Sequence, residues 1–516
     1  MFSVAVGSTS TKKPNNISRR DVLKNTAAAG IASAVVASTT STLSTEAARH
    51  GALHKENVRA DATDWQLTYT KVDPKTRYRC PWIEGYCSRA SVKAGDALDI
   101  FVSANPPGRF TIDIFRMGYY DGAGARLMQQ LGPFDGVTQP DPPIGNERIR
   151  ECQWKPATTI TIPEDWVSGV YLGRLSLVDA PWQSYVVFIV RDERKADIVF
   201  QCSDNTWQAY NRWPDQFALY DDGKSEWALK PGIRVSYDRP YGKYCQILDA
   251  PQSQGSGEFL LWEFPFVYWL EREGYDVTYV SNTDVHAEIK TITRAKAMIS
   301  VGHDEYWSLE QFNHVKQAIA EGLNVGFFSG NTCCFVSPMS PSSAGVPNRN
   351  FTREGCFGGT SKAEADRGMG PFPMEGPDER EIIGARTIIP FNGAGDWIVS
   401  DASHWMFDGT GMKNGDGIPG LVGWEFHGEP ADIPGLKIVA EGDALNSGDE
   451  VAHWTATIYP GPKGNHVFNA STIWWAQGLS SPPGHMLPYS HNGRPHGPDT
   501  RVQRITHNLL KRFLKS

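Results

Sequence analysis

The sequence predicts a two-domain α/β protein, in which an antiparallel β-sandwich precedes a doubly wound domain built on a parallel sheet. Two hydrophobic patterns support this fold class. From about residue 64 to residue 193, apolar and polar residues alternate with a period of two, which is typical of half-buried strands. From residue 194 to residue 516, short apolar runs alternate with segments of helical periodicity, and that order favours a parallel sheet covered by helices.

Composition limits the classes of function. The chain has 516 residues, of which 40% are hydrophobic, so it can form a folded core. Its 50 Lys and Arg against 58 Asp and Glu give a formal charge of −8, and no basic run is long enough to indicate a nucleic-acid partner. The apolar stretch at residues 27–36 is shorter than the roughly 20 residues that a membrane span needs. We therefore expect neither nucleic acid nor a membrane span.

Residues 1–48 are interpreted as a twin-arginine export signal. Arg19 and Arg20 precede a weakly apolar segment at residues 25–38, and Ala47-Ala48 offers a cleavage position. The alternative is a chance pair of arginines in a flexible tail. The signal predicts a periplasmic or extracellular destination, reached by a route that carries folded proteins.

All eight cysteines follow this signal, and an oxidising destination permits disulfides. Cys80 and Cys87 are close in sequence, so we expect them to be bonded or near enough to bond. Cys356 is expected within reach of Cys333 or Cys334. No cysteine pair has the spacing of a zinc site.

In the first domain, strands are expected at residues 96–102, 110–115, 169–178 and 185–190, which together indicate a sandwich of immunoglobulin-like size. The charged residues 191–195 are expected to form a linker to the second domain.

In the second domain, Ser308 and Gln311 form a predicted capping box at the start of a helix. Residues 336–400 are rich in Gly and Pro and are expected to be an irregular, inserted surface region. The other expected elements are strands at 196–200, 275–280, 295–301, 323–328, 436–440, 452–459 and 466–469, helices at 257–274 and 308–321, and a final amphipathic helix with Val502, Ile505, Leu509 and Phe513 on its apolar face.

The loops that follow four of these strands indicate a candidate binding site, because open α/β sheets bind ligands beyond the carboxyl ends of their strands. These loops, at residues 202–211, 281–284, 302–308 and 329–332, are rich in His, carboxylate, amide and phenol groups. The alternative is that they are polar only because they are solvated. The candidate proton-transfer residues are His303 and Glu305, and the candidate substrate-binding residues are Asp204, Asn205, Trp207, Tyr210 and Asn331.

Several motifs in this region also occur together in a known family. In order along the chain they are Trp207–Asn211, Trp269–Tyr275, Gly302–Ser308, Phe328–Asn331, Gly420–Glu425 and Val467–Ala470. This series resembles the C-terminal domain of the large (beta) subunit of N,N-dimethylformamidase and its exported relatives, over roughly residues 195–480. The upstream β-domain resembles the sandwich that precedes this domain in those relatives.

The resemblance implies a fold like that of class I glutamine amidotransferases, and amide hydrolysis at a mononuclear iron held by tyrosines and a glutamate. Tyr306 stands where the family motif supplies one ligand tyrosine, and Tyr268 is the nearest candidate for the second. Ferric iron suits such ligands, because a phenol with an ordinary pKa of about 10 gives up its proton only to a strongly acidic cation. Whether a small partner subunit exists is not visible in this sequence.

The leading functional prediction is an exported hydrolase of non-peptide C–N amide bonds that acts on a small amide and uses iron. The alternative is a non-catalytic binding protein for extracellular glycans, since many of the 17 Trp could stack on sugar rings. Each site residue also has a purely structural interpretation. His303 could cap its loop, Glu305 could be solvated beside a helix start, and Tyr306 could pack against Trp307.

Overall fold

The computed structural model describes residues 51–70, 78–242, 254–366, 368–388, 391–489, 491 and 493–515, so the predicted export signal lies outside the described residues. The protein is a mixed α/β protein with 33% strand and 19% helix. Within the described ranges, no helix has the length and apolarity that crossing a membrane requires.

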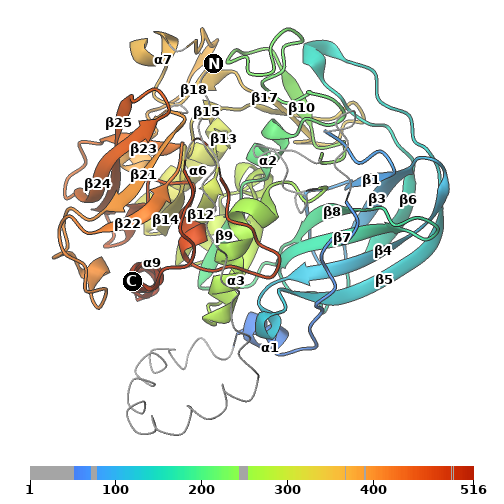
Figure 1. The fold of residues 1–516 in the computed structure, drawn as a ribbon, viewed down its shortest axis with the longest axis horizontal. Coiled ribbons are helices and arrows are strands. Elements are labelled where there is room, and N and C mark those ends of the chain that lie inside the picture. Colours follow the sequence, from blue (N-terminus) through green and yellow to red (C-terminus); the bar gives the residue numbers. More distant parts are fainter. Residues whose placement is uncertain are drawn as a thin grey trace, which may run out of the picture. The chain divides into compact units, whose positions relative to one another are not determined.

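The first part of the described chain forms two sheets around a shared core (Figure 1). A three-stranded sheet has the order β1-β3-β6, and a five-stranded sheet has the order β2-β8-β7-β4-β5. All their pairings are antiparallel except the short β2–β8 pair. The strands are β1 (Ile83–Cys87), β2 (Ser91–Val92), β3 (Ala97–Ala104), β4 (Gly108–Met117), β5 (Ala125–Gly136), β6 (Pro156–Thr161), β7 (Gly169–Leu177) and β8 (Gln183–Val190).

The predicted alternation explains how these strands bury one face. On β3, Leu98, Ile100 and Val102 are at most 2% exposed, whereas Asp99 and Phe101 between them are partly exposed. The inward side chains pack against those of the facing sheet, which is the arrangement expected of strands that are solvated on one side. The four strands expected from the sequence correspond to β3, β4, β7 and β8.

The second part is organised around a nine-stranded sheet with the order β11-β9-β12-β14-β26-β25-β24-β21-β22. Its first five strands are parallel, whereas the remaining pairings are antiparallel. The expectation of a parallel sheet is therefore wrong for one half, because a short turn joins β24 directly to β25 and such a turn forces antiparallel pairing. The strands are β9 (Ile198–Cys202), β11 (Val277–Ser281), β12 (Ala297–His303), β14 (Asn324–Gly330), β21 (Gly393–Ile398), β22 (Gly417–Val422), β24 (Lys437–Asn446), β25 (Val451–Pro460) and β26 (His466–Asn469).

Helices cover both faces of the parallel half. Phe200 on β9 packs into the same core as α3 and α9, whereas its neighbour Val199 packs into the core that contains α6. The helices are α1 (Ala52–Asn57), α2 (Asp204–Tyr210), α3 (Phe264–Arg272), α4 (Asn282–Ala287), α5 (Lys290–Thr293), α6 (Leu309–Glu321), α7 (Lys362–Asp366), α8 (Arg380–Ile383) and α9 (Thr500–Phe513). A π-helical turn at Phe259–Glu263 leads into α3.

The apolar face predicted for α9 is present in the structure, whereas the capping box predicted for α6 is only half formed. The apolar face predicted for the last helix is confirmed, because the four residues that define it are all buried on α9. At α6, the Ser308 hydroxyl accepts the Gln311 N–H (3.0 Å) as predicted. The Gln311 side chain does not return to the cap, however, and donates instead to Gln201 Oε1 (3.1 Å).

Residues 336–400 contain more regular structure than expected. Their last part forms β20 and β21, and β21 joins the main sheet through the pairing of Gly393 with Asn446. The expectation of an irregular surface region is thus wrong for this part. The remaining short strands of the protein are β10 (Arg234–Ser236), β13 (Tyr306–Trp307), β15 (Phe335–Val336), β16 (Met339–Ser340), β17 (Asn350–Thr352), β18 (Gly355–Cys356), β19 (Met374–Glu375), β20 (Ala385–Ile388) and β23 (Phe426–Pro430).

The expected bond between Cys80 and Cys87 is absent. Cys80 Sγ lies 3.8 Å from the carbonyl of Gln183 at the start of β8. Cys87 lines a pocket together with Phe188, five residues further along the same strand. Five strand residues span about 16 Å, which is too far for a disulfide. Cys333, Cys334 and Cys356 are free.

The charged residues 191–195, expected to form a linker, make ion pairs with segments on either side of β11. Arg191 lies 3.0 Å from Asp284, and Arg194 lies 2.5 Å from Asp276. The linker therefore fixes the path of the chain into β9.

Candidate functional site

Four loops at the carboxyl ends of β9, β11, β12 and β14 meet at one edge of the sheet, as the sequence predicts. Asn282, after β11, accepts the Asn205 N–H (3.1 Å) and donates to Asp304 Oδ1 (2.9 Å). Asn331, after β14, donates to Glu305 Oε1 (3.2 Å). These hydrogen bonds tie the four loops together and position the side chains between them.

Three tyrosines surround the carboxylate of Glu305, and we call these four residues the Tyr–Glu cluster. The Tyr210 hydroxyl donates to Glu305 Oε2 (2.8 Å) and lies 2.8 Å from the Tyr220 hydroxyl. The Tyr220 hydroxyl lies 3.4 Å from Glu305 Oε1. The Tyr306 hydroxyl donates a short hydrogen bond to that of Tyr220. Four oxygen-bearing side chains therefore converge in one buried place.

A buried histidine connects this cluster to a second glutamate. His303 Nε2 lies 3.3 Å from Glu305 Oε2 and 2.6 Å from Glu425 Oε2. All three side chains are at most 1% exposed. Glu425 precedes β23, more than a hundred residues after the β12 loop that carries His303 and Glu305.

Burial and mutual charge set the protonation of these groups. Burial lowers the pKa of His303, but the charges of Glu425 and Glu305 outweigh this effect and raise it to about 9. Burial raises the pKa of Glu305 to about 7, although the charge of His303 acts to lower it. At neutral pH the imidazole is therefore cationic and is held between two carboxyl groups, an arrangement typical of acid–base sites.

The phenols of the cluster are protonated at neutral pH, because burial raises the pKa of Tyr210, Tyr220 and Tyr306 well above the ordinary value. Arg353 opposes this effect at two of them. Its guanidinium lies 4.6 Å from the centre of the Tyr220 ring, and its charge lowers the pKa of Tyr220 and Tyr306. It is 1% exposed and is held by the carbonyls of Leu219, Ala228 and Lys230.

Asn205, a predicted substrate-binding residue, lies behind the Tyr–Glu cluster. Its amide donates to the backbone carbonyl of Tyr306 (2.9 Å) and accepts the Tyr237 hydroxyl (2.6 Å). Both polar ends of this side chain therefore have protein partners, and the residue positions β13.

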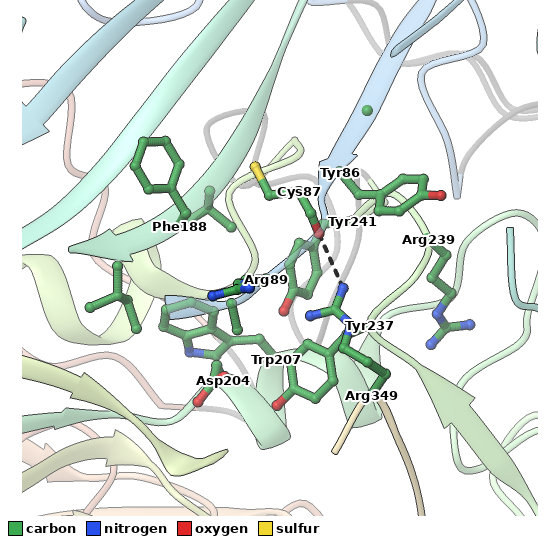
Figure 2. Close-up of a pocket in the computed structure, with 14 residues that line it drawn as sticks. Tyr86, Cys87, Arg89, Phe188, Asp204, Trp207, Tyr237, Arg239, Tyr241 and Arg349 are labelled. Atoms are coloured by element: carbon green, nitrogen blue, oxygen red, sulfur yellow. Dashed lines mark hydrogen bonds between the residues drawn. The ribbon is translucent and has the colours of Figure 1, made fainter. Parts of the chain in front are cut away.

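Asp204 and Trp207, also on α2, have their hydrogen-bond partners outside the cluster. Asp204 Oδ1 accepts the Asn282 N–H (2.7 Å), and burial raises its pKa to about 7. Trp207 Nε1 donates to Glu263 (2.9 Å). Figure 2 shows both residues at a pocket that α2 forms with β1 and β8, where Phe188 stands on the opposite wall.

The sequence identifies five members of the site and misses three. His303, Glu305, Tyr306, Tyr210 and Asn331 lie together as predicted. Tyr220, Glu425 and Arg353 join them from a turn, from the segment before β23 and from the region after β17. Of these three, only Glu425 had a signal in the sequence, because it is the last residue of the Gly420–Glu425 motif.

Tyr268, the expected second ligand tyrosine, is not part of the cluster. Its hydroxyl lies 3.4 Å from the carbonyl of Gly122, and its ring contacts that of Tyr119 edge-on. Both partners belong to the loop between β4 and β5, so Tyr268 packs α3 against that loop.

The cluster offers a metal ion a specific set of donors. Among the residues that the structure describes, no group of three or more His, Cys, Asp or Glu side chains could hold a metal ion. A metal at this site therefore needs phenol oxygens beside the Glu305 carboxylate. Because these phenols have raised pKa values, only a strongly Lewis-acidic cation would displace their protons, and the donor set fits ferric iron better than calcium or magnesium.

Comparison with known proteins places most of the chain in one family model. The model described as N,N-dimethylformamidase beta subunit-like, C-terminal matches residues 111–491. The match begins within β4, so it includes much of the five-stranded sheet as well as the nine-stranded sheet and its loops. A search of curated proteins found no match.

Proposed function

Because this chain belongs to the N,N-dimethylformamidase beta subunit-like family, we propose that it hydrolyses the C–N bond of a small non-peptide amide at the Tyr–Glu cluster. The observation that carries the proposal is the contact between Glu305, two phenol hydroxyls and the His303–Glu425 ion pair, all of them buried. One water-poor site thus combines oxygen ligands for a metal with a charged acid–base pair.

We propose Glu305, Tyr210 and Tyr220 as the ligands of a mononuclear ferric ion. These two phenols are the ones within hydrogen-bonding distance of Glu305, whereas Tyr306 contacts the Tyr220 hydroxyl. In this arrangement Tyr306, the ligand predicted from the sequence, instead orients Tyr220. When bound, iron would polarise the amide carbonyl and acidify a water molecule.

His303 and Glu425 handle the protons of the reaction. Glu425 holds the imidazolium through His303 Nε2, at a distance of 2.6 Å. As water adds to the amide carbon, its proton passes to this pair. The C–N bond then breaks, and His303 Nε2 gives a proton to the leaving amine. Glu305, predicted as a proton-transfer group, acts as a ligand in this scheme.

The remaining sequence expectations are compatible with this function and enter it as proposals. We propose that the protein is exported by the twin-arginine route, and that its two domains are immunoglobulin-like and glutamine-amidotransferase-like. No specific observation favours the glycan-binding alternative. All 17 Trp lie in the described ranges, and of these only Trp227 is exposed, with 55% of its surface accessible.

Iron content and colour test the ligand set. Protein purified from iron-replete cells should carry near-stoichiometric iron and a visible tyrosinate-to-iron charge-transfer band. Tyr220→Phe should abolish the band, whereas Tyr306→Phe should keep the iron and shift the band. Tyr237→Phe, which removes a buried hydroxyl outside the cluster, is the matched control. Loss of the band in Tyr306→Phe alone would assign the ligand to Tyr306, and a wild-type protein without metal would contradict the iron proposal.

Hydrolysis of a panel of formamides and acetamides tests the reaction itself. Glu425→Gln should lower kcat by about 10²–10⁴-fold while iron remains bound, because the variant loses a proton-transfer group and no ligand. Iron-loaded protein that hydrolyses no member of the panel would contradict the proposed activity.

A further inference from the structure

The pocket that α2 forms with β1 and β8 has the features of a second binding site. We propose that it binds the carboxylate group of a small organic acid. The site lies between the two domains, where small-molecule sites commonly occur.

The walls of the pocket are mostly apolar. Figure 2 shows Phe188 and Trp207 across the pocket from each other, with the rings of Tyr237 and Tyr241 to one side of them. The enclosed volume is about 20 Å³, which is room for one small polar group. A carboxylate head can occupy this space while the apolar part of the ligand lies at the mouth, against aromatic rings.

Arg349 supplies a fixed positive charge. Its side chain is 6% exposed, and its Nε and Nη2 lie 3.0 and 2.7 Å from Asp238 Oδ1. Nη2 also donates to the carbonyl of Cys87 (3.1 Å). Among the described residues Nη1 makes no hydrogen bond, so the guanidinium is held in place with one donor group to spare.

Arg89 supplies a second positive charge at the mouth. Its side chain is 55% exposed, and within the described part of the chain its one ion pair is with Asp96 at 3.5 Å. Such exposed pairs contribute little energy, so a ligand can compete for this guanidinium. Figure 2 shows the Arg89 guanidinium on the side of Tyr241 opposite to Arg349.

The charges of the pocket favour an anion over an amine. Its lining residues include three arginines and one acid, Asp204. Burial raises the pKa of Asp204 to about 7, so this carboxyl group is partly protonated at neutral pH and repels an anion less than an ordinary aspartate would. A cationic ligand would instead face Arg89 and Arg349.

The site is distinct from the metal chemistry, because no residue that lines the pocket belongs to the Tyr–Glu cluster. Asp204 and Trp207 face the pocket, whereas Tyr210 on the same helix contacts Glu305. Binding at the pocket can therefore be measured on the full chain whether or not the protein carries iron.

Titration with acetate, propionate and propylamine, followed by ligand-observed NMR, tests the proposal. Acetate and propionate should bind saturably, and propylamine should not. Arg89→Ala should weaken propionate about tenfold or more, because it removes a charged hydrogen-bond donor. The matched control is Arg109→Ala, since Arg109 is 53% exposed and pairs with Asp179 at the same 3.5 Å, away from the pocket. Ala90→Leu should block the pocket and abolish binding.

Three results would overturn the proposal. The first is the absence of saturable carboxylate binding at concentrations up to about 10 mM, which would mean that the free energy of binding is weaker than about −3 kcal/mol. The second is binding of propylamine in preference to propionate. The third is propionate binding that neither Arg89→Ala nor Ala90→Leu changes, since the anion would then sit elsewhere on the protein.

Discussion

Glu425 is the residue that most directly controls the charge at the candidate site. With Glu305 it raises the pKa of His303 to about 9, whereas an ordinary histidine has a pKa near 6.5. Because the pKa is higher in the folded state, the pair stabilises the protein fully below about pH 6.5, and this contribution is lost as the pH rises through 9.

Glu425→Gln should therefore lower the free energy of unfolding by about 3 kcal/mol near neutral pH, because it leaves a buried imidazolium without its closest partner. The difference from wild type should shrink as the pH approaches about 9. Urea unfolding at several pH values measures both effects. Glu441→Gln is the control, since Glu441 pairs with His453 at 3.3 Å on the surface and should matter by less than about 1 kcal/mol. A large difference that did not change with pH would contradict this account.

Tyr220 shows why the candidate site could not be completed from the sequence. His303 and Asn331 were identifiable because each lies at or just beyond the carboxyl end of a strand, and Tyr210 because it lies in the polar segment that follows β9. Tyr220 comes from a turn with no regular pattern, and Arg353 lies in a Gly- and Pro-rich region. Their places beside Glu305 depend on tertiary packing, which no local pattern records.

At the scale of elements, the end of β12 depends on one glycine. Gly302 has φ +72°, and a Cβ there would lie 2.6 Å from the Cβ of Trp262. Both the backbone conformation and the close contact therefore exclude a side chain just before His303.

Gly302→Ala should destabilise the protein by about 2–4 kcal/mol, since it adds a steric clash to backbone strain. Gly345→Ala is the matched control, because Gly345 has φ +80° but no atom within 4 Å of its Cβ position. The control should cost only about 1 kcal/mol, from strain alone. Equal losses in the two variants, measured by chemical denaturation, would show that the contact with Trp262 is unimportant.

The two halves of the large sheet differ in how far the sequence revealed them. β9, β11, β12 and β14 are buried on both faces and read as continuous apolar runs, the pattern of a parallel strand. β21 and β22 contain Gly393, Gly395, Gly417 and Gly420. Glycine is also the main signal of a turn, so the sequence favoured irregular structure around β21 and gave no strand at β22, which ends the sheet.

At the scale of the whole molecule, a buried ion pair joins the five-stranded sheet to helix α3. Arg116 on β4 contacts Glu271 on α3 at 2.8 and 3.1 Å, and both side chains are 0% exposed. Glu271 also accepts hydrogen bonds from Asn57 on α1 and Tyr279 on β11, each at 2.8 Å. Segments of both large sheets thus depend on one carboxylate, so we expect them to unfold together. The sequence predicted a linker between two domains but not this contact, because its partners are 155 positions apart.

A double-mutant cycle on this pair tests that coupling. Arg116→Met and Glu271→Met should each cost about 3–5 kcal/mol, because each leaves its partner as an uncompensated buried charge. The double variant should cost less than the sum, since neither charge then remains in the core. Recovery should be incomplete, because Asn57 and Tyr279 lose their acceptor.

The exposed pair Arg109–Asp179, with its 3.5 Å separation, should give a coupling energy near zero in the same cycle. If the two buried substitutions were additive, or if probes in the five-stranded and nine-stranded sheets reported separate transitions for the wild-type protein, the ion pair would not be what joins these sheets into one cooperative unit.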